Sequence, residues 1–448
     1  MLAVVALAAG STALWADQRD DDIQALREQI RLLDQKLRVL ERKSELKEED
    51  AATAAKAAPK VTVNDKGLTL ASADGANSFK LRGLVQLDSR TFFGDNGITN
   101  NSFVLRRARI ITEGTFAKNF AFQLVPEFGG SAVSILDANL SLSLNKAFVI
   151  KAGKFKVPVG HELLQSDSWT FFNERALPTN LVPNRDVGVQ LGGDLFDGTV
   201  SYAAGVFGGV PDGGSSSNSD FDNEKDFAGR IFATPFKNDA GSPLQGLGVG
   251  VSGSLGRQKT VSGLTGGYRT PGQQTFFRYR ATALNDGQVW RISPHADYRN
   301  GSLGIVGEYV VSVTNARPAP GAAKAELENK AWQIAAGYVL TGEDSSYAGV
   351  VPKTNFDLTA GTWGAFEVVA RFENLKVDQA AFPLFADPAV SANEASTVGV
   401  GLNWYLSKAV RATFDYYQTA FENNSLVPSS LLLRQDEKAL ITRFQVAF

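Results

Sequence analysis

Three arginines stand within four positions in the segment FVLRRARIITEGTF, residues 103–116. The guanidinium groups of Arg106, Arg107 and Arg109 stay charged at any working pH and offer forked N–H donors that match carboxylate or phosphate oxygens. Isoleucines follow them directly, so this part of the chain needs water on one side and an apolar environment on the other. The chemistry that such a cluster offers is the recognition of anions.

Residues for catalysis or metal binding are scarce. The 448-residue chain has no cysteine and two histidines, His161 and His295, which stand far apart in the sequence. A thiol nucleophile, a cysteine-ligated metal and a Ser/His/Asp site therefore lack material. The glycine-rich runs GGVPDGGSSSNSD and GLTGGYRTPG lack the Lys-Ser/Thr ending of a phosphate-binding loop. We predict that the protein is not an enzyme and has no catalytic residues, no metal site and no cofactor.

The composition points toward strands and turns and away from nucleic acid. The net charge is −2, charged residues make up 21% of the chain, and neither end carries an acidic or basic tail. The 43 glycines and 29 phenylalanines suit a fold with many strands and turns.

From Phe79 to the C-terminus, apolar and polar residues alternate with a period of two. In FKLRGLVQLDSR, residues 79–90, the odd positions hold most of the apolar side chains, and the even positions hold Lys80, Arg82 and Arg90. About sixteen segments of this kind, most of them near ten residues long, are separated by turns or loops. Each predicted strand therefore has one apolar face and one wet face.

Two all-β architectures share this alternation. A soluble β-sandwich is one alternative; a transmembrane barrel is the other, because its closure leaves no unpaired edge in lipid. Aromatic residues bracket the apolar face, as Trp290 and Tyr298 do, and with strand tilt such spans approach an apolar band of about 25 Å. We predict an all-β fold, a transmembrane antiparallel up-and-down β-barrel of about 16 strands. It covers residues 78–448, encloses an aqueous channel and follows a short α-helical coiled coil.

The barrel register predicts where the arginines point. Arg107, Arg109 and Glu113 face the pore, whereas Arg106 falls on the lipid-side register, where it sits at the headgroup edge, snorkels or marks a bulge. Residues of two neighbouring strands then form a basic ladder that favours anions: Lys80, Arg82, Arg90, Arg107 and Arg109. Other predicted pore-lining residues are Glu113, Arg291, Arg371, Arg411 and Arg443.

Several stretches, taken in order, resemble the phosphate-selective porin O/P family of Gram-negative outer membranes. They are FKLRGLVQLD, FVLRRARI, KAGKFKVPVG, NRDVGVQLGG, YVLTGE, WGAFEVVARF and GLNWYLS, and the resemblance covers nearly everything from Phe79 to Phe448. It implies a homotrimer of sixteen-stranded barrels in the cell outer membrane, surrounded by lipid, with one pore per subunit. It also implies a long loop after the fifth strand, folded inward as the constriction, which in this chain is Pro158 to Asp186.

The expected constriction loop carries charges of both signs. The residues concerned are Glu162, Asp167, Glu174, Arg175, Arg185 and Asp186. The best-known members of the family gather lysines at the constriction, and this loop contains none. Acidic and basic residues are about equally common on the predicted pore face. We therefore expect an outer-membrane diffusion channel for small hydrophilic solutes that weakly prefers anions such as phosphate, with arginines opposite carboxylates producing a transverse field.

The N-terminal segment differs from the rest. Residues 1–16 hold an uncharged apolar stretch that predicts a secretory signal peptide, since a transmembrane anchor, the alternative, needs roughly 20 residues. Residues 17–47 repeat apolar side chains at alternating steps of three and four, which predicts a periplasmic coiled coil rather than an amphipathic helix lying on its own domain. Its seam is Ile23, Leu26, Ile30, Leu33, Leu37 and Leu40. The Ala-rich residues that follow predict a linker over 48–77.

Two questions stay open at this point. Ile and Leu in the seam favour two strands in isolated coiled coils, whereas the family resemblance favours three subunits. The coiled coil also suggests a second function, a structural anchor that reaches peptidoglycan and tethers the outer membrane to the cell wall. The last strand, KALITRFQVAF, ends in Phe448 and resembles the signal that the outer-membrane assembly machinery recognises; an apolar edge strand is the alternative.

Overall fold

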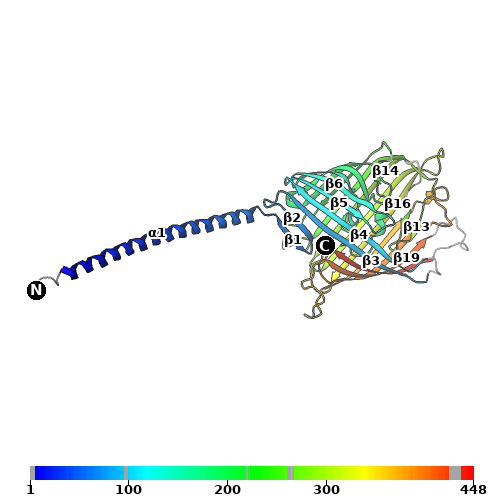
Figure 1. The fold of residues 1–448 in the computed structure, drawn as a ribbon. Helices are drawn as coiled ribbons and strands as arrows, with labels where there is room; N and C mark the ends of the chain where they lie inside the picture. The colour runs from blue at the N-terminus through cyan, green and yellow to red at the C-terminus, as the bar shows by residue number, and fades with distance from the viewer. Residues whose placement is uncertain are drawn as a thin grey trace. The chain divides into compact units, whose positions relative to one another are not determined.

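The computed structural model describes residues 6–94, 99–217, 220, 222–259, 264, 267–422 and 435–448. The chain divides into two units, one built on a long N-terminal helix and the other on a β-barrel, drawn in Figure 1. Each unit is described separately below.

The helical unit is a single helix, α1 (Ala6–Ala57), of 52 residues. All six side chains of the predicted seam are exposed. The helix runs ten residues beyond the expected coiled coil, because residues 51–57 are mostly alanine, the strongest helix former, and it stops just before Pro59. No helix among the described residues combines the length and apolar character needed to cross a bilayer.

Two short strands occupy part of the stretch expected to be a linker. They are β1 (Lys60–Asn64) and β2 (Gly67–Ala71), which pair with each other, and β2 also pairs with β3. Gly67 has φ 98°, and a Cβ there would lie 2.2 Å from the carbonyl oxygen of Leu81, so this close approach requires glycine. The stretch expected to be a linker, residues 48–77, thus contains the end of α1 and the strands β1 and β2.

Sixteen strands among the described residues form a closed antiparallel barrel. Each pairs with the next, and β20 pairs with β3, so no edge is left open. The strands are β3 (Ser78–Phe92), β4 (Ser102–Phe116), β5 (Phe120–Glu127), β6 (Ser134–Asn145), β7 (Phe148–Lys156), β8 (Arg185–Leu195), β9 (Val200–Phe207), β10 (Asp226–Ala233), β11 (Leu247–Lys259), β14 (Leu284–Asn300), β15 (Leu303–Arg317), β16 (Ala325–Val339), β17 (Ala365–Lys376), β18 (Glu394–Tyr405), β19 (Val410–Glu422) and β20 (Glu437–Ala447).

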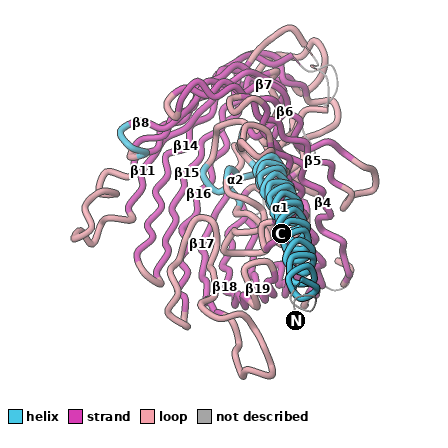
Figure 2. Tube along the Cα trace, turned by 60° about the vertical axis from the view of Figure 1, so that its left-hand side comes forward, coloured by secondary structure: helices cyan, strands magenta, loops and turns pink. Residues whose placement is uncertain are grey.

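The two ends of the barrel differ in their connections, and Figure 2 shows loops at both ends of long strands. At the short-turn end most connections are brief, as at 301–302, and the C-terminus lies there (Figure 1). At the long-loop end the connections are longer and include the hairpin of β12 (Tyr268–Arg269) and β13 (Thr275–Phe277). Residues 340–364, between β16 and β17, are a long connection at the short-turn end.

The alternation seen in the sequence matches the two faces of the barrel wall. On β16, Ile334 faces outward and is 53% exposed, whereas its neighbour Gln333 faces the lumen and is 3% exposed. Closure also joins the last residue to the first strand, because Phe448 and Gly83 exchange backbone hydrogen bonds of 2.9 and 3.0 Å. A Cβ added to Gly83 would lie 2.7 Å from the aromatic ring of Phe448, so the ring packs directly against this glycine.

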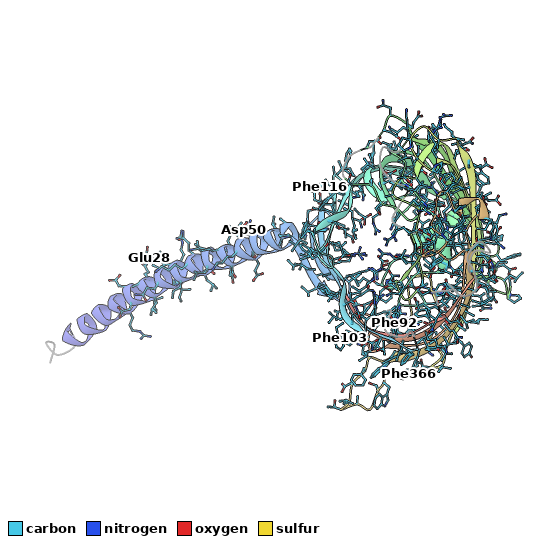
Figure 3. All side chains as sticks on the ribbon, turned by 90° about the vertical axis from the view of Figure 1, so that its right-hand side faces the viewer. Glu28, Asp50, Phe92, Phe103, Phe116 and Phe366 are labelled. Atoms are coloured by element: carbon cyan, nitrogen blue, oxygen red, sulfur yellow. The ribbon has the colours of Figure 1, made fainter. Side chains whose placement is uncertain are left out.

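Part of the lumen is filled by protein. An apolar cluster joins the constriction loop, the β12–β13 hairpin and residues 377–393 to the inward faces of β15, β16 and β17. Its members include Leu177, Phe277, Phe385, Ala331 and Leu375, all fully buried. Figure 3 shows side chains crowding the lumen beside the yellow and orange strands. The open part of the lumen therefore lies mainly on the side formed by β3 to β10.

Candidate functional site

The constriction loop, residues 157–184, leaves β7 and returns into β8, the fifth and sixth strands of the barrel. It contains the helical turn α2 (His161–Leu164) and the 3-10 turn η1 (Leu177–Asn180), and most of its residues are buried. Two cavities lie against it inside the barrel. One, of about 850 Å³, opens toward the short-turn end, and the other, of about 570 Å³, opens toward the long-loop end.

Three side chains line both cavities and so lie between them. We call Arg109, Asp167 and Arg185 the neck. Arg109 donates from Nε to Glu127 Oε2 at 2.6 Å and also binds Asp167, while Arg185 Nε lies 3.2 Å from Asp137 Oδ1. The neck thus sets wall guanidinium groups against a carboxylate that projects from the loop.

A β-bulge explains the run of arginines in β4. Arg107 pairs with Gln86 and Leu105 pairs with Leu87, so Arg106 has no residue opposite it. The bulge turns Arg106 toward the lumen, where it binds Glu174 through two hydrogen bonds of 2.6 and 2.9 Å. The expected position of Arg106 on the lipid side or at the headgroup edge is wrong; the bulge, which was the third alternative, is present. Alternation along a strand assigns a side chain to the wrong face where a bulge inserts one extra residue.

The loop carboxylates are held in their charged form. Burial alone would raise the pKa of Asp167, but Arg107, Arg175 and Arg109 hold that pKa well below its usual range. Burial acts on Glu174 in the same way, and Arg106 and Arg443 outweigh it, so the pKa of Glu174 is also well below its usual range. Both side chains therefore carry a negative charge at neutral pH.

The loop is tied to the far wall by many hydrogen bonds. The backbone N–H of Asn173 donates to Asp415 Oδ2 at 2.6 Å, and that of Leu177 donates to Glu373 Oε2 at 2.6 Å. Arg443 binds Glu174 Oε1 at 2.7 Å and Asp88 Oδ1 at 2.6 Å. These contacts fix the loop against β17, β19 and β20 and leave the path on its other side.

Four arginines that were predicted to line the pore are bound to inward-folded connections instead, three of them to the constriction loop and Arg291 to the β9–β10 connection. Arg291, Arg371, Arg411 and Arg443 point into the barrel but are only 2–4% exposed. Arg411 donates to loop carbonyl oxygens, Arg371 lies 4.5 Å from the ring centroid of Phe172, and Arg291 binds Asp212 at 2.7 Å. Their expected position along open water is corrected, because loop atoms that no strand pattern reveals occupy the adjacent space.

The remaining predicted residues fall in three places. Lys80 and Arg82 line the short-turn cavity and share Glu113, at 3.3 and 2.9 Å. Arg107 lines the long-loop cavity, whereas Arg90 lines neither cavity and binds Asp88 at 3.2 Å. Glu162 and Arg175 hold the loop, since Glu162 accepts from Gln333 and Arg175 binds Asp167, whereas Asp186, which was expected in the loop, stands on β8 and accepts from the N–H of Gly209.

Two lysines at the site were missed because they stand on a strand and not in the loop. Lys151 and Lys156, both on β7, line the short-turn cavity together with Arg230 of β10. Lys156 donates to the carbonyl oxygens of Leu163 and Gln165 at 2.7 and 2.8 Å and so caps the end of α2. The stretch KAGKFK carried the signal, since two of its lysines fall on a strand that borders the loop.

Lys151 and Arg230 also differ from the neck in their partners. Lys151 Nζ lies 5.3 Å from the ring centroid of Phe155, and the Arg230 guanidinium lies 4.7 Å from that of Phe232. Among the described residues, neither has a carboxylate within ion-pair distance. Around the short-turn cavity, nine Lys and Arg side chains face three Asp side chains, and around the long-loop cavity six arginines face four carboxylates.

In the described part of the chain, no group of three His, Asp or Glu side chains is arranged so that it could hold a metal ion. The geometry is that of a charged passage past an inward-folded loop.

Comparison with solved structures finds the same architecture. The outer membrane channel DcaP of Acinetobacter baumannii is 10% identical, with a TM-score of 0.53, over 83% of this chain and 98% of that chain. OmpT of Vibrio cholerae is 13% identical, with a TM-score of 0.52, over 83% and 98%. The anion-selective porin from Comamonas acidovorans is 13% identical, with a TM-score of 0.52, over 83% and 100%. At these identities the likeness concerns the fold.

No curated protein sequence matches the chain. The family model described as phosphate-selective porin O and P, however, matches residues 79–448, which are the whole barrel from its first strand to the C-terminus. The chain therefore belongs to the phosphate-selective porin O and P family.

Proposed function

We propose that this outer-membrane porin is a diffusion channel for small hydrophilic solutes with a weak preference for anions. The observation that carries the proposal is the excess of cationic side chains around the solute path, nine against three in the short-turn cavity. A cavity with low-dielectric walls and one sign of charge concentrates counter-ions. Anions therefore spend more time near the neck than cations do.

The preference is weak because the cations at the neck already have carboxylate partners. Arg109 is bound to Glu127 and Asp167, and Arg185 is bound to Asp137. A guanidinium whose forked donors are engaged can attract a passing anion electrostatically but cannot offer it both N–H groups. Phosphate should therefore pass without being held tightly, and phosphate uptake is one use of a channel that also passes other anions.

Lys151 and Arg230 supply the attraction that the neck lacks. Both line the short-turn cavity, and neither has a carboxylate partner among the described residues. An anion that leaves one cation meets the next within the same cavity, so transport proceeds by exchange between weak sites. Conduction requires sites of this kind, favourable enough to enter and weak enough to leave.

Reversal potentials in a KCl gradient across a planar bilayer test the proposal. A potential of the sign that marks chloride preference is expected, with phosphate added at equal concentration leaving most of the chloride current unblocked. Clear cation preference would overturn the anion proposal, and a tight phosphate block would overturn the weak-site mechanism.

A second function, tethering of the outer membrane to the cell wall, is favoured by the length of α1. From residue 17 to its end the helix extends about 60 Å at 1.5 Å per residue. Its exposed apolar seam would be buried between copies of this chain in a homotrimer, with the N-terminal segment in the periplasm. Deletion of residues 17–57 should leave conductance unchanged and abolish co-sedimentation with purified peptidoglycan; wild-type protein that fails to co-sediment would remove the tether.

A further inference from the structure

The only two histidines of the chain are in ring contact. His161, the first residue of α2, and His295, on β14, have ring centroids 4.9 Å apart and planes inclined by 21°. Both side chains are buried. One belongs to the constriction loop and the other to the barrel wall, so their contact joins the loop to the wall.

Two further rings extend this contact. Phe232 of β10 lies 5.5 Å from His161 and 5.9 Å from His295, and Tyr347 of the 340–364 connection lies 5.2 Å from His161. Tyr347 also donates from its hydroxyl to the His161 carbonyl oxygen at 3.1 Å. We call these four rings the histidine stack. It fixes the first turn of the loop against β10, β14 and residues 340–364.

The hydrogen bonds of the stack suit neutral imidazoles. His295 Nδ1 lies 2.9 Å from the carbonyl oxygen of Ser293, an acceptor, so Nδ1 carries the proton. Its other nitrogen, Nε2, is buried and has no partner among the described residues. Gly250 leaves room for that nitrogen, since a Cβ there would stand 2.6 Å from it. A proton added at Nε2 would be a buried donor without an acceptor.

The charged neighbours can satisfy one added proton but not two. His161 Nε2 lies 3.4 Å from Asp297 Oδ2, and Asp297 also accepts from Arg299 on the same strand. Glu308 of β15 is engaged by the backbone N–H of His161 and by Ser293. Arg230 lies over Phe232 and adds a positive charge beside the stack. A second imidazolium would therefore face the first one and a guanidinium.

We propose that the histidine stack is a proton-operated latch on the constriction loop. Near neutral pH, stacking and the Asp297 contact hold the loop against β14. Below the free imidazole pKa, about 6.5, acid favours the released loop, because two protonated rings held in contact where water screens them poorly would repel each other. The first turn of the loop then leaves the wall and moves toward the neck in brief closures, while the rest of the loop stays bound to the far wall.

Single-channel recordings of the full-length protein at pH 7.5 and pH 4.5 test the latch. The wild type should show about tenfold more frequent brief closures at pH 4.5, the change that one pKa unit of coupling gives. His295→Phe keeps a buried ring but cannot accept the proton, so its closure frequency should not depend on pH. Tyr338→Phe, an aromatic exchange on the outer face, should respond as the wild type does. Acid closures that persist in His295→Phe would assign the response to carboxylates and overturn the latch.

A spectroscopic measurement separates loop release from other effects. The chain has no cysteine, so Ser166→Cys, at an exposed position of the loop, accepts a single spin label. The label should become more mobile between pH 7.5 and pH 4.5, and this change should be absent when His295→Phe is added. Equal mobility at both pH values in the otherwise wild-type protein would also overturn the proposal. The mobility of the label does not depend on ion selectivity, so this measurement still tests the latch if the proposed anion preference is wrong.

Discussion

The two halves of the lumen wall carry similar basic residues and use them differently. On the β17 to β20 side, Arg371, Arg411 and Arg443 are buried against the constriction loop and hold it in place. On the β7 to β10 side, Lys151 and Arg230 face the short-turn cavity without a carboxylate partner among the described residues. We call these the sealed wall and the open wall. A basic side chain on the lumen face thus attracts solutes only where no other part of the protein already binds it.

The largest expected effect follows from removing a cation of the sealed wall. Arg443→Leu leaves Asp88 and Glu174 buried with one partner fewer each, and breaking such a buried pair costs about 3–5 kcal/mol of stability. Thermal unfolding in detergent, followed by circular dichroism, measures the loss. Lys80→Gln, which removes a partly exposed cation outside this wall, is the control and should stay within about 0.5 kcal/mol of the wild type. Equal stability of the two variants would erase the distinction between the walls.

The barrel itself was predictable because alternation is a local property. Lipid on one side and water on the other impose a period of two on every strand, and residues 325–339 show it in Gln333 and Ile334. The position of the constriction loop followed from the family resemblance. Neither required knowledge of distant contacts.

The contacts of the sealed wall could not be predicted, because they join residues that are far apart in the sequence. Whether Arg443 meets water or Glu174 depends on residues 269 positions apart, and no spacing rule reports that contact. Arg106 was misplaced because a single inserted residue in β4 reverses the parity that the pattern assumes. The histidine pair was dismissed because the two residues are distant in sequence. Sequence therefore predicted which face a side chain occupies better than it predicted its partner.

The neck lies between the two walls, and Asp167 is the carboxylate that offsets the positive charge of the arginines there. Asp167→Asn keeps the shape of the side chain but removes the charge that faces Arg107, Arg109 and Arg175. The permeability ratio of chloride to potassium should rise about tenfold, equivalent to about 1.4 kcal/mol. Reversal potentials in a KCl gradient measure it. A ratio unchanged by this substitution would mean that ions do not pass the neck.

A smaller effect is expected on the open wall. Lys151→Gln combined with Arg230→Gln removes two half-buried cations that line the short-turn cavity and should lower the chloride preference about twofold, because a charge that water partly screens contributes about 1 kcal/mol or less. Lys376→Gln removes an exposed cation near the long-loop end, where Lys376 pairs with Glu394, and serves as the control. If the control lowers the preference as much as the pair does, the open wall has no special part in selectivity.

The neck should be insensitive to moderate acid, in contrast to the histidine stack. The pKa values of Asp167 and Glu174 are well below their usual range. A carboxylate with a depressed pKa contributes stability above its unfolded value, about 3.9 for Asp and 4.3 for Glu, and loses it only as the pH falls from there through the folded value. Between pH 7.5 and pH 5 both groups therefore stay charged, and the reversal potential should stay constant.

The expected constancy makes the two pH experiments independent. A change in closure frequency with a constant reversal potential would assign the acid response to the histidine stack and leave the neck untouched. A shift of the reversal potential toward anions between pH 7.5 and pH 5 would mean that Asp167 or Glu174 takes up a proton there. The guanidinium groups around them would then not hold these carboxylates in the charged form, and the balance assigned to the neck would be wrong. The reversal potential of Asp167→Asn serves as the reference for this comparison, because in that variant the negative charge of residue 167 is absent at every pH.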